Sequence, residues 1–234
     1  MYPMLKYLFT AALFFNFSIA HGQRISYDDW NNQAKDNIRL LPEYGHVQKT
    51  DEQKRLDENL IEEETKQEGT RRKASEHLIS LGFNYLTRGD AKTAMYRFNQ
   101  AWLLDPANEN VYWGFGAVYF SFNDFKKAEA QYDKGLKMNP NNTNILTDKA
   151  TIYLGDFEER HDKNSFNKAL ALFQKSYSID PTNQNTTYKL SVLYFVNKDC
   201  KNALKYFLEC KKYGGRPIVP EYEKAMKETC KYSK

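Results

Sequence analysis

The sequence of 234 residues is poor in the side chains that most often build metal and catalytic sites, with only three cysteines and four histidines. No HExxH or CxxC pattern brings any of them to the spacing of metal ligands. The nucleophile motif GxSxG and the phosphate-binding motif GxxxxGK[ST] are missing as well. The sequence therefore predicts no catalytic residue, no metal site and no cofactor. It favours a protein that is not an enzyme.

Long apolar runs and an excess of one charge are also missing. Beyond Gly22 the sequence has no apolar run of about 20 residues, which excludes a multi-span membrane protein. The 34 Lys and Arg residues are nearly balanced by 30 Asp and Glu residues, so the formal net charge is only +4. Because nucleic-acid-binding domains carry a concentrated basic face, no nucleic acid is expected as a partner. An aromatic content of 15% excludes a chain that is disordered throughout.

The start of the chain, MYPMLKYLFTAALFFNFSIAHG, has the layout of a secretory signal peptide. A single cation, Lys6, precedes a short apolar stretch, and small residues follow at Ala20 and Gly22. Cleavage after either small residue would release the mature chain. The alternative, an uncleaved membrane anchor, is less favoured because Asn16 interrupts an apolar run that is already too short for a bilayer. Residues 1–22 therefore predict a secreted or periplasmic protein of the cell envelope.

The rest of the chain contains an internal repeat. Three turn dipeptides, Asp105-Pro106, Asn139-Pro140 and Asp180-Pro181, are separated by 34 and 41 residues. An alanine followed four residues later by an aromatic residue recurs as Ala94 and Phe98, Ala128 and Tyr132, Ala169 and Phe173, and Ala203 and Phe207. A tyrosine recurs upstream of these pairs, at Tyr85, Tyr119, Tyr153 and Tyr194. One unit has therefore been copied four times.

This pattern resembles the tetratricopeptide repeat (TPR) family, whose unit of about 34 residues places a small residue, a tyrosine, an alanine, an aromatic residue and a proline at these offsets. The resemblance covers residues 75–217. It implies an all-α, right-handed TPR solenoid of four repeats, at residues 75–108, 109–142, 143–183 and 184–217. The third repeat holds seven extra residues between its helices, and the fourth replaces the closing proline with Gly214-Gly215. Good N-cap residues stand where each second helix is expected to begin: Asp90, Asp124, Ser165 and Asp199.

The segments on either side of the repeats have their own predicted roles. Residues 23–74 combine scattered apolar positions with many charges, which predicts a partly ordered N-terminal arm that leads into a charged helix. Residues 218–234 contain Pro220, which can open a helix. Because terminal units of solenoids need a polar outer face, this segment is expected to form a C-terminal capping helix.

The three cysteines lie near the C-terminus, and their spacing limits which of them can pair. Cys200 and Cys210 are ten residues apart on one expected helix, about 15 Å by helical rise, which is too far for a disulfide. If the last repeat helix and the capping helix are antiparallel, Cys200 and Cys230 lie at the same level. A disulfide between these two is therefore possible, with Cys210 a buried thiol. The alternative, three reduced thiols, stays open at this point.

The insertion in the third repeat groups five polar side chains that could hold a cation: Asp156, Glu158, Glu159, His161 and Asp162. They lack the spaced oxygen ligands and the glycine of a calcium loop. A solvated polar loop is therefore the favoured prediction for this segment.

In TPR proteins the first helices of successive repeats line a concave groove, so the resemblance implies that partner contacts come from one face of these helices. Here that face is aromatic, with an asparagine at the same position of three repeats. The candidate residues are Phe83, Asn110, Trp113, Phe120, Asn144, Asn185, Tyr188 and Phe195. The amides could bond the backbone of an extended peptide, and the rings could supply most of the binding energy. Packing of several rings between repeats or against the arm is an alternative that stays open here.

The same face lacks the basic side chains with which some TPR domains clamp the acidic C-termini of chaperones. Ile79, Phe83 and Gly114 stand at the corresponding positions, so a chaperone receptor is disfavoured. The leading hypothesis is a non-catalytic scaffold outside the cytoplasm that binds a protein or peptide segment in this groove, within an envelope-associated complex. A second hypothesis is a carbohydrate or small-ligand binding module that uses the aromatic groove. A third is an accessory module of an enzyme carried on another chain.

Overall fold

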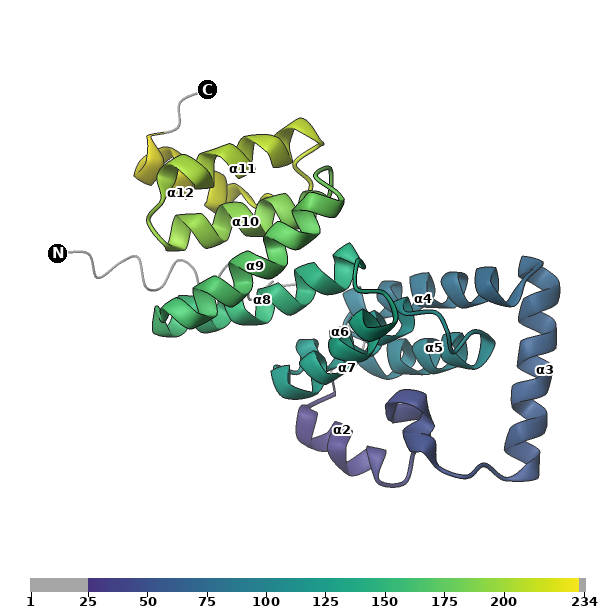
Figure 1. The fold of residues 1–234 in the computed structure, drawn as a ribbon. Coiled ribbons are helices and arrows are strands. Elements are labelled where there is room, and N and C mark those ends of the chain that lie inside the picture. Colours follow the sequence, from purple (N-terminus) through teal and green to yellow (C-terminus); the bar gives the residue numbers. More distant parts are fainter. Residues whose placement is uncertain (1–24, 232–234) are drawn as a thin grey trace. The chain divides into compact units, whose positions relative to one another are not determined.

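The computed structural model describes residues 25–231, and every regular element in this range is helical (Figure 1). The described residues fall into two compact units, 25–145 and 146–231, which we call the N-terminal and the C-terminal unit. The predicted signal peptide lies outside the described residues. Among the described residues, no helix combines the length and the apolar character needed to cross a membrane.

The N-terminal unit begins with the arm and continues with helix pairs. Its elements are α2 (Tyr27–Ala34), the 3-10 turns η1 (Ile38–Leu40) and η2 (Pro42–His46), α3 (Asp51–Glu68), α4 (Arg71–Thr87), α5 (Ala91–Leu104), α6 (Asn110–Ser121) and α7 (Phe125–Met138). Helix α8 (Thr143–Arg160) crosses the boundary between the units. The C-terminal unit contains α9 (Lys163–Ile179), α10 (Gln184–Val196), α11 (Cys200–Lys212) and α12 (Pro220–Cys230). Paired helices stacked in this way form an all-α solenoid, as the sequence predicts.

Glycines let the paired helices of the N-terminal unit approach each other closely. A Cβ atom on Gly82 or on Gly114 would lie 2.4 Å from the ring of Phe98. A Cβ atom on Gly116 would lie 2.2 Å from the ring of Tyr132. Because real carbon atoms do not approach so closely, the repeated small residue and the repeated aromatic residue are two halves of one packing contact.

The turns between repeats are built from side chains that cap the backbone. Asp105, Asn139 and Asp180 each accept a hydrogen bond from the backbone N–H two residues on, at 3.0, 3.0 and 2.9 Å. Three residues after each of these, an asparagine caps the next helix by accepting a backbone N–H: Asn108 from Asn110, Asn142 from Ile145, and Asn183 from Asn185 and Thr186. The recurring turn motif thus satisfies the backbone groups that a helix start leaves unpaired.

The prediction of a polar loop in the third repeat is wrong, because the inserted residues lengthen the two helices of this repeat. Helix α8 continues to Arg160, and His161 adopts the left-handed conformation with φ 54°. Asp162 then caps α9 by accepting the N–H of Ser165 at 2.9 Å, so Ser165 is not the N-cap that the sequence suggested. The added turn buries Phe157, whose ring lies 5.2 Å from that of Phe166. Burial of this aromatic side chain favours helix over loop.

The other expected N-caps hold their positions. Asp90, Asp124 and Asp199 accept the N–H of Thr93, Lys127 and Asn202 at 3.0 to 3.1 Å. Across residues 25–231, no three His, Cys, Asp or Glu side chains are placed as a metal ion would require.

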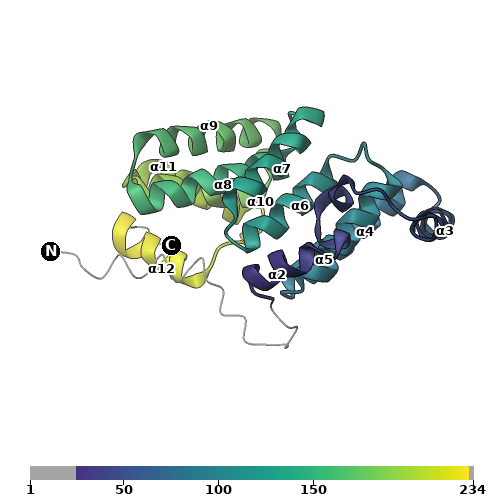
Figure 2. The ribbon, with the colours of Figure 1, turned by 90° about the horizontal axis from the view of Figure 1, so that it is seen from below.

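Within the N-terminal unit, residues 25–49 fold onto the helix pairs, and α3 then extends along the outer edge of the unit (Figures 1 and 2). Trp30 and Leu40 are fully buried and belong to the same hydrophobic core as α4, α5 and α6. No residue of α3 is buried. This helix is held at its start by a capping box between Thr50 and Gln53, and it ends at Gly69, which has φ 83°.

The cap helix α12 closes the C-terminal unit. Tyr222 and Met226 are buried in its core. A disulfide joins Cys200 to Cys230, the pair that the antiparallel register brings level, with Cα atoms 5.2 Å apart. Cys210 is a buried free thiol whose Sγ donates to the carbonyl of Gln184 at 3.5 Å, and burial raises its pKa.

Candidate functional site

Two of the predicted aromatic residues meet on successive first helices of the N-terminal unit. Phe83 of α4 and Trp113 of α6 are half-buried, and their ring centroids are 4.1 Å apart. Phe83 also contacts the edge of Phe98, at 5.2 Å. Because Phe98 is fixed between the glycines of paired helices, the Phe83–Trp113 pair is anchored to the core. Phe120 lies further along α6, with its ring 5.3 Å from that of Phe125.

The asparagines at the predicted position differ in their surroundings. The side-chain oxygen of Asn110 accepts a hydrogen bond from Asn142 at 2.8 Å, so Asn110 helps to hold the turn between repeats. Asn144 is half-exposed near the start of α8. Asn185 is exposed at the start of α10, where its backbone N–H donates to Asn183 at 3.0 Å. Of the three, Asn144 and Asn185 are the more accessible.

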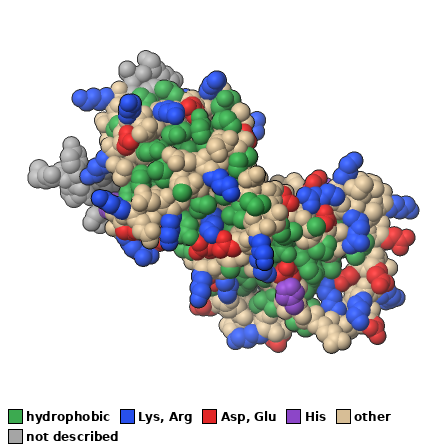
Figure 3. Space-filling model, in the orientation of Figure 1, with side chains coloured by type: hydrophobic (Ala, Val, Ile, Leu, Met, Phe, Trp, Pro, Cys, Tyr) green, Lys and Arg blue, Asp and Glu red, His purple; other side chains and the backbone are tan. Residues whose placement is uncertain are grey.

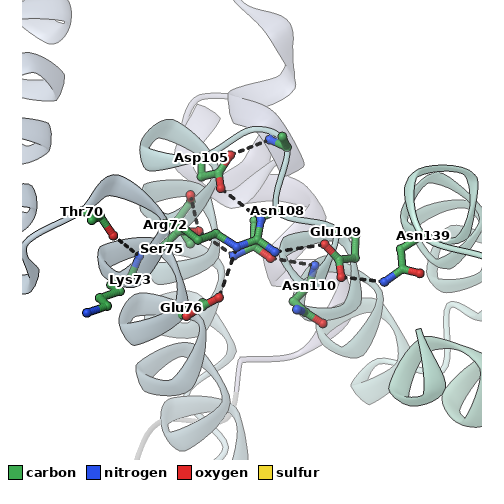
Figure 4. Close-up of polar contacts among 12 residues, drawn as sticks. Thr70, Arg72, Lys73, Ser75, Glu76, Asp105, Asn108, Glu109, Asn110 and Asn139 are labelled. Carbon is green, nitrogen blue, oxygen red and sulfur yellow. Dashed lines mark hydrogen bonds and ion pairs between the residues drawn. The ribbon is translucent and has the colours of Figure 1, made fainter. Parts of the chain in front are cut away.

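Asn139, in the turn that follows α7, belongs to a polar network centred on Arg72 (Figure 4). The guanidinium group donates to Glu76, Asp105 and Glu109 at 3.2, 3.0 and 3.3 Å. Glu109 in turn accepts from Asn139 at 2.9 Å. Burial raises the pKa of Glu109, but the hydrogen bonds from Asn139 and Arg72 outweigh it and hold the pKa below its usual value. We infer a structural role for this network, because it ties consecutive turns together.

The predicted residues of the C-terminal unit pack against the cap helix. The rings of Tyr188 and Phe195 lie 5.4 and 5.5 Å from that of Tyr222. Burial raises the pKa of Tyr188 to about 12, with a smaller contribution from the charge of Glu158. For these two rings, packing is therefore at least part of their role.

The structure thus divides the predicted residues between the two units. Phe83 and Trp113 are brought together in the first, while Tyr188 and Phe195 share Tyr222 in the second. We call the side of α4 and α6 that carries Phe83 and Trp113 the first-helix face.

Two charged groups on α8 and α10 are not among the predicted residues. Burial raises the pKa of Glu158 to about 7, against the opposing charge of Lys189. Burial lowers the pKa of Lys189, while the charges of Asp148 and Glu158 act in the opposite direction. The sequence predicts a loop at Glu158, whereas the continuation of α8 to Arg160 places this residue on a helix.

A second surface, whose residues are not among the predicted site residues, holds the N-terminal arm. The ring of Phe122 lies 5.1 Å from Tyr27 and 5.0 Å from Trp30. The hydroxyl of Tyr27 donates to Asp124 and accepts from Lys127, the latter at 2.8 Å. The start of the arm therefore rests on the turn between α6 and α7.

A buried asparagine on α5 binds the backbone of the arm. The amide of Asn99 donates to the carbonyls of Arg39 and Leu41 at 2.9 and 3.0 Å, and its oxygen accepts the N–H of Tyr44 at 3.3 Å. One side chain thus satisfies three backbone groups of an irregular segment. In the sequence, the only sign of this contact is an asparagine at a position expected to be buried. The asparagine alone does not show which segment of the chain it binds.

A buried carboxylate fixes the end of the arm to α6 and α7. Glu43, at φ 56°, accepts from the hydroxyl of Tyr112 at 2.8 Å and pairs with Lys134 at 2.6 Å. Burial raises the pKa of Glu43, but these hydrogen bonds and the charge of Lys134 hold it below its usual value. A hollow of about 230 Å³ remains between η2 and α7, and Tyr119 forms part of its lining. The contacts of the arm thus fall on α5, on α7 and on the side of α6 that carries Tyr112 and Tyr119.

Comparison with known proteins identifies the repeat. Residues 85–154 match the family model described as tetratricopeptide repeat. Among solved structures, the chain is similar to PilF of Pseudomonas aeruginosa, with a TM-score of 0.51 and 19% identity over 69% of this chain and 73% of that one. MamA is similar with a TM-score of 0.46 and 18% identity, over 73% of this chain and 97% of that one. No curated protein matches the chain. Identities this low concern the fold alone.

Proposed function

Because this chain is a tetratricopeptide repeat protein, and hence an interaction scaffold, we propose that it binds a segment of a partner protein on the first-helix face, outside the cytoplasm and without catalysis. The resemblance to the family supports this choice of face, because TPR proteins bind their ligands in a concave groove lined by the first helices of successive repeats.

The observation that carries this proposal is the Phe83–Trp113 pair. The two rings come from successive repeats, lie 4.1 Å apart and are half-buried. Large aromatic side chains that are held rigidly lose little entropy on binding, and they dominate the energy of many interfaces. Residues 39–44 of the arm are held by Asn99 of α5, Tyr112 of α6 and Lys134 of α7.

Two features support a location outside the cytoplasm. Residues 1–22 have the layout of a cleaved signal peptide. The disulfide between Cys200 and Cys230 is of a kind that persists in oxidising compartments and is rare in the cytosol. A scaffold in this location would serve an envelope-associated complex.

The test is recovery of a crosslinked partner from envelope extracts by wild-type protein and by the Trp113→Ala variant. We expect the variant to lose most of the partner, because truncation of a central aromatic residue typically weakens an interface by about tenfold or more. Met138→Ala is the control, since this apolar side chain is 42% exposed on α7 and lies outside the pair. Tyr188 is a poor probe, because its truncation would also remove a packing contact with Tyr222.

Partner recovery that is unchanged in Trp113→Ala, with a circular dichroism spectrum like that of wild type, would remove the first-helix face from the proposal. Binding of an envelope glycan by wild-type protein, lost in the same variant and with no protein recovered, would favour the carbohydrate hypothesis instead.

A further inference from the structure

The surface that holds the arm has a counterpart in the C-terminal unit. Corresponding positions of the two repeat pairs stand two repeats apart, as with Phe98 and Phe173 or Ala128 and Ala203. With the same offset, Asn99 corresponds to Gln174, Trp102 to Tyr177, Tyr119 to Tyr194, Gln131 to Tyr206 and Lys134 to Glu209. The amide that binds the arm, Asn99, and the tyrosine that lines the hollow, Tyr119, therefore recur as Gln174 and Tyr194.

The counterpart positions form one connected cluster. The rings of Tyr194 and Tyr206 are stacked, 5.7 Å apart with planes 5° from parallel. Tyr177 contacts Tyr206 edge-on at 5.3 Å, and its hydroxyl donates to Glu209 at 2.7 Å. The hydroxyl of Tyr194 is within hydrogen-bond reach of the side chain of Gln174. We call Gln174, Tyr177, Tyr194, Tyr206 and Glu209 the tyrosine surface.

The tyrosine surface is accessible and already ordered. Tyr177 and Tyr194 are half-exposed, and Gln174 is exposed. Hydrophobic side chains gather over α9, α10 and α11 on the face shown in Figure 3, with lysines among them. Rings fixed by stacking and by a hydrogen bond are preorganised, which lowers the entropic cost of binding.

The charges around the tyrosine surface determine what it would attract. Helix α9 has no acidic residue, and Glu209, the one on α11, already accepts from Tyr177. The remaining carboxylate that acts on Tyr194, Asp199, caps α11 by accepting the N–H of Asn202. The helices that carry the rings also carry four exposed lysines: Lys175 on α9 and Lys201, Lys205 and Lys212 on α11. The ammonium group of Lys205 lies 4.7 Å from the centre of the Tyr206 ring. An acidic ligand is therefore complementary to this face.

The arm of a second copy does not fit this surface in the way it fits its own. On the N-terminal unit, Glu43 of the arm pairs with Lys134. The position of Lys134 is held by Glu209 in the C-terminal unit, so the same placement would bring two carboxylates together. Like charges at this position disfavour the second arm as the occupant.

We propose that the tyrosine surface is a second binding site, which takes an acidic segment of a partner protein in place of the arm. An apolar side chain of the segment rests on Tyr177 and Tyr194, its carboxylates face Lys201 and Lys205, and its backbone bonds Gln174 as the arm bonds Asn99. This site is separate from the first-helix face, so the two can fail independently.

The probe for the test is a set of peptides selected from a random phage-displayed library on the purified protein, then synthesised with a fluorescent label. We expect acidic peptides among them, with an affinity for Lys201→Glu/Lys205→Glu about tenfold weaker than for wild type and weakened further by salt. Lys126→Glu/Lys137→Glu makes the same change of charge at exposed positions of α7 and should bind as wild type. Trp113→Ala should also leave this binding unchanged.

The proposal is overturned if no selected acidic peptide depends on Lys201 and Lys205, or if the control pair weakens binding equally. Tyr177→Ala should also weaken the binding of the selected peptides, because an apolar side chain of the peptide is expected to pack on this ring. The melting temperature of the variant checks that it is folded. Sedimentation gives a further check. A wild-type dimer that the Lys201→Glu/Lys205→Glu variant dissociates would make a second copy the occupant and contradict a partner protein.

Discussion

Phe98 and Tyr132 can fill the space between paired helices only because a glycine faces each ring. The side chain and the missing side chain lie on different helices, so neither can change alone. The sequence pattern predicts this contact well, because the two residue types recur at fixed offsets in successive repeats.

A single added methyl group should therefore disrupt a repeat. Gly116→Ala would place Cβ 2.2 Å from the ring of Tyr132, and we expect a loss of about 1 to 3 kcal/mol in the free energy of unfolding. Gly155→Ala is the matched control, because it lies within α8 with no atom within 4 Å of the added Cβ. It should raise stability by about 0.5 to 1 kcal/mol through helix propensity. Urea unfolding of both variants measures the difference, and equal stabilities would contradict this packing.

Glu43 should make the attachment of the arm sensitive to acid. Its pKa is lower in the folded protein than in the unfolded chain, so its contribution to stability is present at neutral pH and is lost as the pH falls through the folded-state pKa. Glu43→Gln should cost about 1 to 2 kcal/mol at neutral pH, and this difference from wild type should shrink below a pH of about 4. Unfolding across a pH series tests this. A constant difference, or the same effect in the exposed control Glu62→Gln, would contradict it.

At the scale of elements, the sequence predicts those helices whose ends carry a recurring signal. Asp90, Asp124 and Asp199 mark helix starts because the same cap recurs at the repeat spacing. The third repeat departs from that spacing, so Ser165 was placed by analogy, although Asp162 was the better cap. Periodicity locates elements only where the period holds, and the extension of α8 depends instead on the burial of Phe157.

The sequence predicts a partly ordered arm, but it does not predict the contacts that fix the arm to the N-terminal unit. The fold of the arm is made of 3-10 turns and left-handed residues, which carry no periodic pattern. The groups that satisfy it, Asn99, Tyr112 and Lys134, lie about 55 or more residues away in the sequence. The site residues are predicted from the groove that the family forms with its first helices. That resemblance does not predict the surface that holds the arm, because this surface is formed largely by other helices.

Removal of the disulfide should loosen the cap helix. In the chain-entropy view, a link that closes a loop of 30 residues stabilises the fold by about 3 to 4 kcal/mol. Cys200→Ser/Cys230→Ser should therefore melt at a lower temperature than oxidised wild type and at the same temperature as reduced wild type. Scanning calorimetry with and without reductant measures this. Wild-type melting that does not respond to reductant, together with three alkylated thiols, would contradict the link.

At the scale of the whole molecule, the described fold begins soon after the predicted signal peptide. Ile25 already packs against the core of the N-terminal unit. We expect export to cleave the chain after Ala20 or after Gly22, so that the mature chain begins at His21 or Gln23. Mass spectrometry of protein purified from the envelope or the medium reads the new N-terminus. An unprocessed chain found only in the cytoplasm would contradict the proposed location.

The network around Arg72 bears on how four similar repeats find their correct order. Repeats that resemble one another can also pair wrongly, with one unit skipped or exchanged between two chains. Proline stands at the positions that correspond to Arg72, at Pro106, Pro140 and Pro181, so the contacts of this arginine with Asp105 and Glu109 can form at one junction only. Misordered pairing leaves the two carboxylates without their cation. The network therefore stabilises the correct pairing of the first two repeats. Because it can form only at this junction, it favours the native order of the repeats over misordered pairings.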